Sequence, residues 1–175
     1  MKTHQPVQDR AKDAVAQCLI KQLHVPTVYF DAPWPSGRNH TDLLIIDRAG
    51  TGDVHVVEIT KDLDAALKYI PRILKIPAQF RWIAYVDEPV ARKSLHRIDR
   101  NQRRACNAPL YPPKGMGRVG VIAVGSGGES AADDVEKVED SFDAEVVVSA
   151  ERFPGSYYDE ADEFIKAHRP DIMFR

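Results

Sequence analysis

The stretch from His40 to Asp62, HTDLLIIDRAGTGDVHVVEITKD, constrains the fold of this chain more than any other. It contains two apolar runs, 43–46 and 53–60, with a short connection between them that holds two glycines. Two such runs joined by a short glycine connection are typical of a β-hairpin. The pattern therefore predicts two antiparallel strands, 42–47 and 53–60.

An acid stands at each of the two strand ends that this hairpin brings together. Asp42 opens the first run, and Glu58 lies near the end of the second, followed closely by Lys61. The start of one antiparallel strand lies beside the end of its partner, so we expect the two carboxylates to converge. Carboxylates are hard oxygen ligands that suit Mg²⁺ or Mn²⁺. The spacing predicts a divalent-metal site at this edge of the sheet.

The rest of the chain alternates between helical and extended patterns. Apolar spacing predicts helices over 6–23, 62–76, 89–104 and 157–168, and strands over 28–30, 79–86, 118–124 and 144–149. Pro71 is expected to kink the second helix or divide it in two. The alternation predicts the α/β class, with a central mixed sheet flanked by helices. The length of 175 residues suits one domain of ordinary size.

Composition narrows the setting. The chain is 43% hydrophobic and 29% charged, as in soluble globular proteins. No stretch reaches the length of a membrane span and the first residues contain no apolar signal region, so we expect a cytoplasmic protein without a membrane partner. Cys18 and Cys106 form no metal-ligand pattern, and Cys18 is expected as a reduced thiol in the core.

The acid, the turn, and the apolar strand ending in an acid and a lysine resemble the PD-(D/E)XK nuclease superfamily. The resemblance covers residues 6–86 and implies a restriction-endonuclease-like α-β-β-β-α-β core in 1–88, with 89–175 adding a basic helix and a C-terminal β/α extension of the sheet. It implies hydrolysis of DNA or RNA phosphodiester bonds, with Mg²⁺ or Mn²⁺ held by Asp42, Glu58 and the backbone carbonyl of Ile59. An acid on the first helix often assists in this family, and Asp13 is the candidate here.

The lysine of the pattern is displaced by one residue. The sequence reads Glu58-Ile59-Thr60-Lys61, so Thr60 occupies the lysine position and Thr41 replaces the proline. Side chains alternate along a regular strand, which points Lys61 away from the Glu58 face. A bulge would return Lys61 to that face, Lys68 on the next helix would supply the charge instead, or the site is catalytically impaired.

The second helix contains three basic residues at helical spacing, Lys68, Arg72 and Lys75. They form either a solvated face or a set of phosphate contacts beside the site.

A strongly basic segment follows the last strand of the resemblance. Between 92 and 104 one acid stands against six basic residues, namely Arg92, Lys93, Arg97, Arg100, Arg103 and Arg104. Such a patch attracts DNA or RNA through phosphate neutralisation and counterion release. The competing interpretation is internal pairing, because residues 129–145 contain eight acids against one lysine. Both interpretations are retained.

Three smaller features have simpler interpretations. Trp34 is expected to anchor its loop on the core edge, with a base-stacking surface as the alternative. The glycines at 125–128 lack a phosphate-loop spacing and are expected to form a turn. His168 is expected at the surface or as a helix cap.

Two functional hypotheses of different classes follow from the sequence. The first is a metal-dependent nuclease with Asp42, Glu58 and either Lys61 or Lys68 at its site. The second is a protein of the same fold without catalysis, binding nucleic acid or a protein partner, and the displaced lysine favours it. An unrelated α/β domain is a third interpretation. Homo-oligomer formation is left open.

Overall fold

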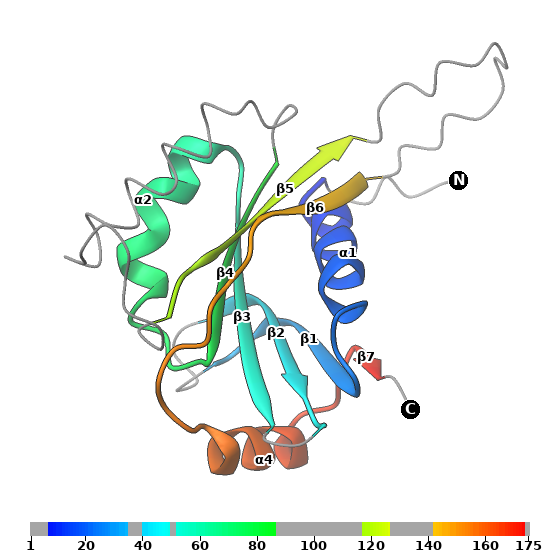
Figure 1. Cartoon of the computed structure of the whole chain (residues 1–175). Helices are drawn as coiled ribbons and strands as arrows, with labels where there is room; N and C mark the ends of the chain where they lie inside the picture. Colours follow the sequence, from blue (N-terminus) through cyan, green and yellow to red (C-terminus); the bar gives the residue numbers. More distant parts are fainter. Residues whose placement is uncertain (1–6, 35–39, 50–51, 87–116, 127–141, 174–175) are drawn as a thin grey trace, which may run out of the picture.

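The computed structural model describes residues 7–34, 40–49, 52–86, 117–126 and 142–173. Along the chain, these contain α1 (Val7–Ile20), β1 (Pro26–Ala32), β2 (Thr41–Asp47), β3 (Asp53–Thr60), α2 (Leu63–Ile73), β4 (Phe80–Val86), β5 (Gly120–Ser126), β6 (Phe142–Val148), α4 (Tyr158–Ala167) and β7 (Ile172–Met173). Figure 1 shows them in the colours of the sequence. The predicted α/β class is confirmed.

The strands form one seven-stranded mixed sheet in the order β6-β5-β4-β3-β2-β1-β7. β1, β2 and β3 pair antiparallel in succession, and β3, β4 and β5 pair parallel. The two edge strands, β6 and β7, pair antiparallel with their neighbours. The predicted hairpin pairing of 42–47 with 53–60 is confirmed, with Leu43 opposite Val57 and Asp47 opposite Asp53.

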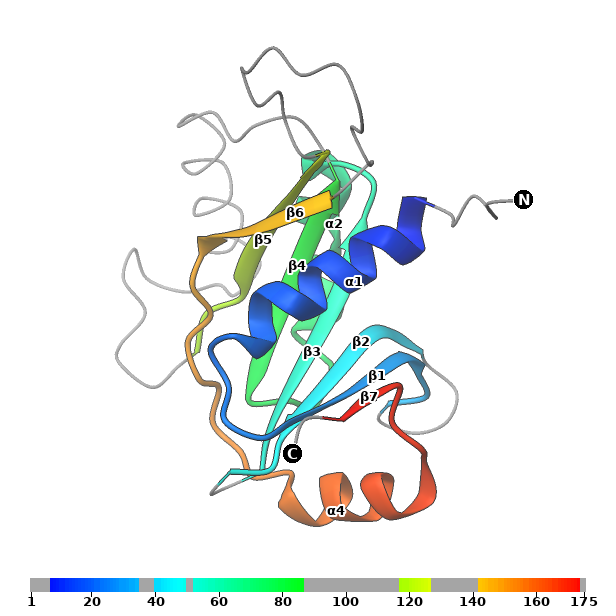
Figure 2. The ribbon, with the colours of Figure 1, turned by 90° about the vertical axis from the view of Figure 1, so that its right-hand side faces the viewer.

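Helices cover both faces of the sheet, and strand alternation sorts the apolar side chains between them (Figures 1 and 2). On β2 and β3, Leu43, Ile45 and Val57 belong to the core under α1. Leu44 and Ile46 belong to the opposite core, under α2 and α4. The side-chain face of a residue on β2 or β3 therefore follows from its position in the alternation.

Local sequence explains where α2 begins and ends. Asp62 caps its start, because its carboxylate accepts a hydrogen bond from the N–H of Ala65 at 2.7 Å. The helix continues through Pro71 and ends at Ile73, so of the two expected effects of Pro71, a kink or a division, the division does not occur. Pro71 lies in the last turn, where a missing N–H removes only one helical hydrogen bond.

Several boundaries differ from the expected ones. β1 extends two residues further at each end than predicted, and β7 was not predicted at all. β7 contains only two residues, which pair with Thr27 and Val28 of β1, so its local sequence contains too little pattern to detect. The predicted helix over 89–104 lies outside the described residues. None of the described helices combines the length and apolar character needed to cross a membrane.

Candidate functional site

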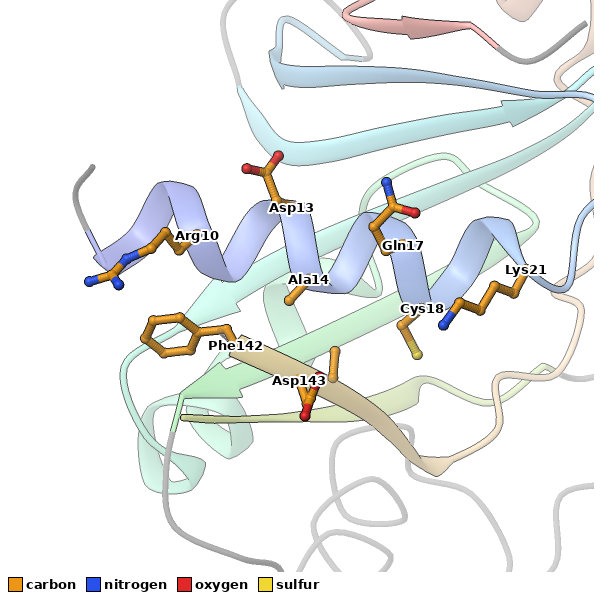
Figure 3. Close-up of a pocket in the computed structure, with 9 residues that line it drawn as sticks. Arg10, Asp13, Ala14, Gln17, Cys18, Lys21, Phe142 and Asp143 are labelled. Carbon is orange, nitrogen blue, oxygen red and sulfur yellow. The ribbon is translucent and has the colours of Figure 1, made fainter. Parts of the chain in front are cut away.

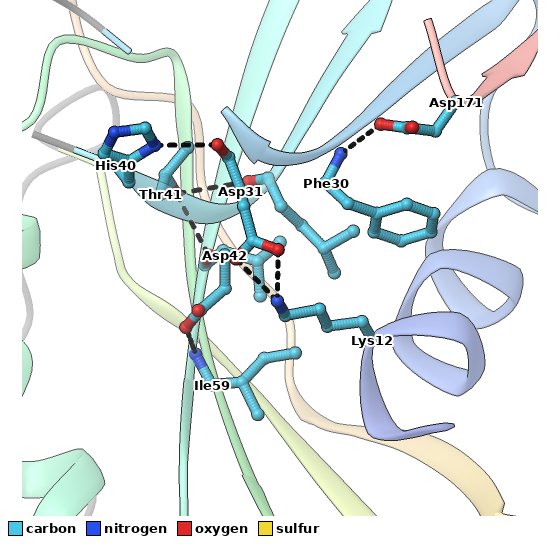
Figure 4. Close-up of polar contacts among 10 residues, drawn as sticks. Lys12, Phe30, Asp31, His40, Thr41, Asp42, Ile59 and Asp171 are labelled. Atoms are coloured by element: carbon cyan, nitrogen blue, oxygen red, sulfur yellow. Dashed lines mark hydrogen bonds and ion pairs between the residues drawn. The ribbon is translucent and has the colours of Figure 1, made fainter. Parts of the chain in front are cut away.

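At one end of the β2–β3 pairing, side chains of β2 take the place of backbone groups in the hydrogen bonds to β3. Beyond the Leu43–Val57 pair, the hydroxyl of Thr41 donates to the carbonyl of Val57 at 3.0 Å. The carboxylate of Asp42 accepts from the N–H of Ile59 at 2.6 Å (Figure 4). Thr41 and Asp42 therefore complete the sheet where its own ladder stops. Asp42 has a structural role as well as a candidate chemical one.

Asp42 and Glu58 lie side by side at this point. One further step of the register beyond Leu43 and Val57 places them opposite each other, on the sheet face covered by α2. Glu58 is 6% exposed, and its Oε1 atom is buried without a hydrogen-bond partner. A buried carboxylate oxygen without a partner is costly and marks a position set by something other than packing.

Burial and neighbouring carboxylates raise the pKa of both carboxyl groups, with Asp42 acting on Glu58 and Asp31 acting on Asp42. Burial, together with the negative charge of Asp42, raises the pKa of Glu58 to about 7. Burial also raises the pKa of Asp42, against the lowering effects of the Ile59 N–H and the Lys12 ammonium. Two close carboxyls with raised pKa values form a strong candidate site, because a divalent cation would relieve both the burial cost and the repulsion.

Two cations act on this pair. The sequence did not predict Lys12, and it predicted Arg72 only as one of three basic residues of the second helix. Arg72 of α2 lowers the pKa of both Asp42 and Glu58, and Lys12 of α1 lowers that of Asp42. The predicted lysines lie elsewhere. Lys61 follows the end of β3, with its side chain 85% exposed and its Nζ 3.7 Å from an oxygen of Asp62.

Lys68 is exposed on the side of α2 opposite the residues that the helix buries, which are Leu63, Ala66, Ile70 and Ile73. Thr60, which takes the lysine position of the pattern, donates its hydroxyl to the carbonyls of Asp62 and Ala84. The structure therefore brings the two predicted acids together, and Lys12 and Arg72, in place of Lys61 and Lys68, act on their pKa values.

A third acid lies in the same row. Asp31 falls between the pairs Phe30–Leu43 and Ala32–Thr41, which places it opposite Asp42 on the other side. Its backbone has a φ of 49°, a left-handed conformation that is uncommon for a residue with a side chain. Both of its carboxylate oxygens bind the ammonium of Lys12, at 2.6 and 2.7 Å (Figure 4).

The sequence interpretation missed both partners of this ion pair, although a signal for each exists. Lys12 is 6% exposed and lies among Ala11, Val15 and Ala16 on the buried face of α1. A lysine on an apolar helix face is an exception that needs a partner. The position of Asp31 beside Asp42 could be predicted by extending the antiparallel register from the hairpin to the preceding strand, β1. His40 also lies here, with its Nδ1 2.8 Å from the carbonyl of Asp31.

Other predicted features have plain structural roles. Trp34 is 2% exposed, donates from its indole N–H to the carbonyl of Pro77 at 2.8 Å, and packs edge-on against Phe164. It anchors its loop as predicted, and the stacking-surface alternative is wrong because the ring is buried. His168 follows α4 as its C-terminal cap.

Asp13 and Cys18 line a groove of about 330 Å³ between α1 and β6 (Figure 3). Cys18 is half-buried there, so its expected place in the core is wrong. Asp13 is exposed, and α1 directs the neighbouring Lys12, not Asp13, to the row of acids. The basic residues 92–104 and the acids of 129–141 lie outside the described residues.

The residues present are chemically suited to Mg²⁺ or Mn²⁺, which favour carboxylate oxygens. Two observations support this fit. Asp42 lies next to Glu58 in the β2–β3 register, and one oxygen of Glu58 has no hydrogen-bond partner. Across the described ranges, no three His, Cys, Asp or Glu side chains lie close enough to hold a metal as a group. A metal here would complete its coordination with backbone carbonyls, water and substrate.

Comparison with protein-family models, with curated proteins and with solved structures found no match to this chain. The geometry of the site therefore carries the functional argument.

Proposed function

We propose that this chain is a metal-dependent hydrolase of phosphodiester bonds in DNA or RNA, with Asp42 and Glu58 as its protein ligands to Mg²⁺ or Mn²⁺. One observation carries the proposal: Glu58 buries an unpartnered carboxylate oxygen beside a second carboxylate. Such an arrangement costs stability in a metal-free protein, and a divalent cation offsets the cost.

Each residue has a part that follows from its contacts. Asp42 is fixed by its hydrogen bond to the N–H of Ile59, the residue that follows Glu58. The backbone carbonyl of Ile59 is the third proposed ligand. Held by these groups, a divalent cation would supply Lewis acidity toward a phosphoryl oxygen and a water molecule. The binding of nucleic acid by the segment 92–104 remains part of this proposal.

A second function has a specific observation in its favour. The strand position that holds lysine in the nuclease pattern holds Thr60, whose hydroxyl is engaged by the carbonyls of Asp62 and Ala84. A protein of this fold without the catalytic lysine would bind nucleic acid, or a protein partner, and leave it intact. Metal uptake without cleavage would support this alternative.

The test compares the wild type with Asp42→Asn and Glu58→Gln. Wild type, with Mg²⁺ or Mn²⁺, should cleave single-stranded or double-stranded DNA or RNA, and each variant should lose at least about a thousandfold of that rate. Mn²⁺ uptake, measured by calorimetric titration, should be lost in parallel. Asparagine at 42 still offers a carbonyl oxygen to the N–H of Ile59, so the fold should be retained.

Glu163→Gln on α4 is the matched control, because it removes the same charge from an exposed helix position. It should cleave and bind Mn²⁺ like the wild type. Undiminished Mn²⁺ uptake in both site variants would overturn the proposed metal site.

A further inference from the structure

The alternation of side chains along β1 is broken at Asp31. Residues two apart on a regular strand share a face of the sheet. Phe30 packs against the core under α1, and Ala32 is buried in the opposite core, under α2 and α4. The side chains of Phe30 and Ala32 therefore change face within two residues. The left-handed backbone of Asp31, with a φ of 49°, lies between them and accounts for the change.

This break decides where the third carboxylate of the row lies. The pairs on either side of Asp31 place it opposite Asp42, and opposite residues of antiparallel strands share a face. With an extended backbone, Asp31 would therefore lie on the face of Asp42 and Glu58. Its carboxylate instead accepts from the ammonium of Lys12 on α1, at 2.6 and 2.7 Å (Figure 4).

Two contacts hold Asp31 in this position. The Lys12 side chain is 7% exposed and that of Asp31 is 63% exposed, so the ion pair anchors an accessible carboxylate to a buried ammonium. His40 contacts the same residue, because its Nδ1 lies 2.8 Å from the carbonyl oxygen of Asp31. A left-handed backbone is unfavourable for a residue with a Cβ atom and persists only where its surroundings enforce it. Loss of the Lys12 ammonium would therefore favour a return of Asp31 to the extended form.

The number of carboxylates at a metal site distinguishes divalent cations. Mg²⁺ is usually bound through few carboxylates and keeps several water ligands, whereas Ca²⁺ takes about six to eight oxygen ligands. Among the described residues, no three His, Cys, Asp or Glu side chains lie close enough to share a metal. With Asp31 held aside, Asp42 and Glu58 form a two-carboxylate site that suits the smaller cation.

Resting on the proposed function, we propose that Lys12 sets the cation selectivity of the metal site. By holding Asp31 on the α1 side of the sheet, Lys12 keeps a third carboxylate away from Asp42 and Glu58 and biases the site toward Mg²⁺ and against Ca²⁺. Lys12 acts through Asp31 and contacts neither the metal nor the substrate, so it is a positioning residue.

The experiment measures the ratio of the Mg²⁺ and Ca²⁺ dissociation constants of the full chain. MgCl₂ or CaCl₂ displaces bound Mn²⁺, and electron paramagnetic resonance reports the free Mn²⁺. Lys12→Met removes the ammonium and keeps an unbranched apolar stem in the core. It should strengthen Ca²⁺ binding by about tenfold or more relative to Mg²⁺, because Asp31 then joins Asp42 and Glu58. The double variant Lys12→Met/Asp31→Asn should return the ratio to that of wild type.

The ratio separates this role from a simple charge effect. Removing a positive charge strengthens the binding of both cations alike, because both carry the same charge. Lys21→Met is the matched control, since it removes an exposed lysine just beyond the end of α1. It should leave the ratio unchanged. Asp31→Asn alone should also leave the ratio unchanged, because Asp31 is not a ligand while Lys12 holds it, and asparagine tolerates a left-handed backbone.

An unchanged ratio in Lys12→Met, in a variant that folds by circular dichroism and binds Mn²⁺, would overturn the role of Lys12 and leave the metal site standing. A changed ratio in Asp31→Asn would also overturn it, because Asp31 would then be a ligand in the wild type. Where Lys12→Met does not fold, Lys12→Gln replaces it. Its neutral amide holds a carboxylate more weakly than an ammonium does, so the same shift is expected, at about threefold or more. Absence of Mn²⁺ uptake by the wild type would overturn the proposed metal site and this inference together.

Discussion

His55 and Glu58 lie three residues apart on β3, and both are buried titratable side chains, at 6% exposure each. His55 stacks on Phe80, with ring centroids 4.5 Å apart, and its Nδ1 accepts a hydrogen bond from the indole N–H of Trp82 at 3.3 Å. Glu58 faces the other side of the sheet and buries an oxygen without a partner.

The difference separates a structural polar group from a candidate functional one. Burial lowers the pKa of His55 to about 4, so the ring is neutral at physiological pH and fits its apolar surroundings. Burial and Asp42 raise the pKa of Glu58 to about 7, so that carboxyl group is close to changing charge there. Burial alone marks neither as functional. Glu58 differs from His55 in burying an unpartnered oxygen beside a second carboxylate.

The largest expected effect is a loss of stability when His55, the buried group with a hydrogen-bond partner, is removed. His55→Ala should lower the free energy of unfolding by about 3 kcal/mol, because it leaves a cavity beside Phe80 and an indole N–H without its acceptor. Urea unfolding followed by circular dichroism at pH 7.5 measures it. Glu58→Gln under the same conditions should cause no loss. A His55→Ala effect below about 1 kcal/mol would mean that the ring is not an integral part of the core.

A smaller effect tests Glu58, the group with an unpartnered oxygen, through the pH dependence of the free energy of unfolding. The folded-state pKa of Glu58, about 7, lies above its ordinary value of 4.5, so the folded state binds the proton more tightly and wild type loses stability as pH rises from 4.5 to 7. Glu58→Gln cannot ionise. In EDTA it should match wild type near pH 4.5 and exceed it by at most about 3 kcal/mol at pH 8. A difference that stays constant across this range would contradict the raised pKa.

The same variant, Glu58→Gln, reveals the effect of His55 on the pH dependence of stability. The folded-state pKa of His55, about 4, lies below its ordinary value of 6.5, so its contribution is complete above pH 6.5 and is lost as pH falls toward 4. In wild type this loss opposes the gain from Glu58 between pH 4.5 and 6.5. Glu58→Gln removes the opposing gain, so its unfolding free energy should fall more steeply toward acid than that of wild type.

The smallest expected effect concerns the lysine of the original pattern. Lys61→Ala should change Mn²⁺-dependent cleavage by less than about threefold and the free energy of unfolding by less than about 0.5 kcal/mol, because the side chain is 85% exposed beyond the strand. Steady-state kinetics and urea unfolding check both values. A hundredfold loss of cleavage would show that Lys61 turns back toward Glu58 when substrate is bound.

Much of the fold was predictable because its signals are local. The hairpin, the helix after it and β4 each show their own periodicity, and the antiparallel register then places Asp42 beside Glu58. The surroundings of this pair were less predictable. Asp31 meets Lys12 across 19 residues of sequence, and Arg72 of α2 lowers the pKa of both acids.

The sequence by itself determined which residues alternate on β2 and β3, because strand geometry depends only on neighbouring residues. It thereby determined that Asp42 and Glu58 share a face. Only the tertiary structure decided that Glu58 buries one oxygen without a partner, that His55 has a partner in Trp82, and that Arg72 acts on both acids. The physical reason is that burial and charge proximity depend on which distant segments pack together.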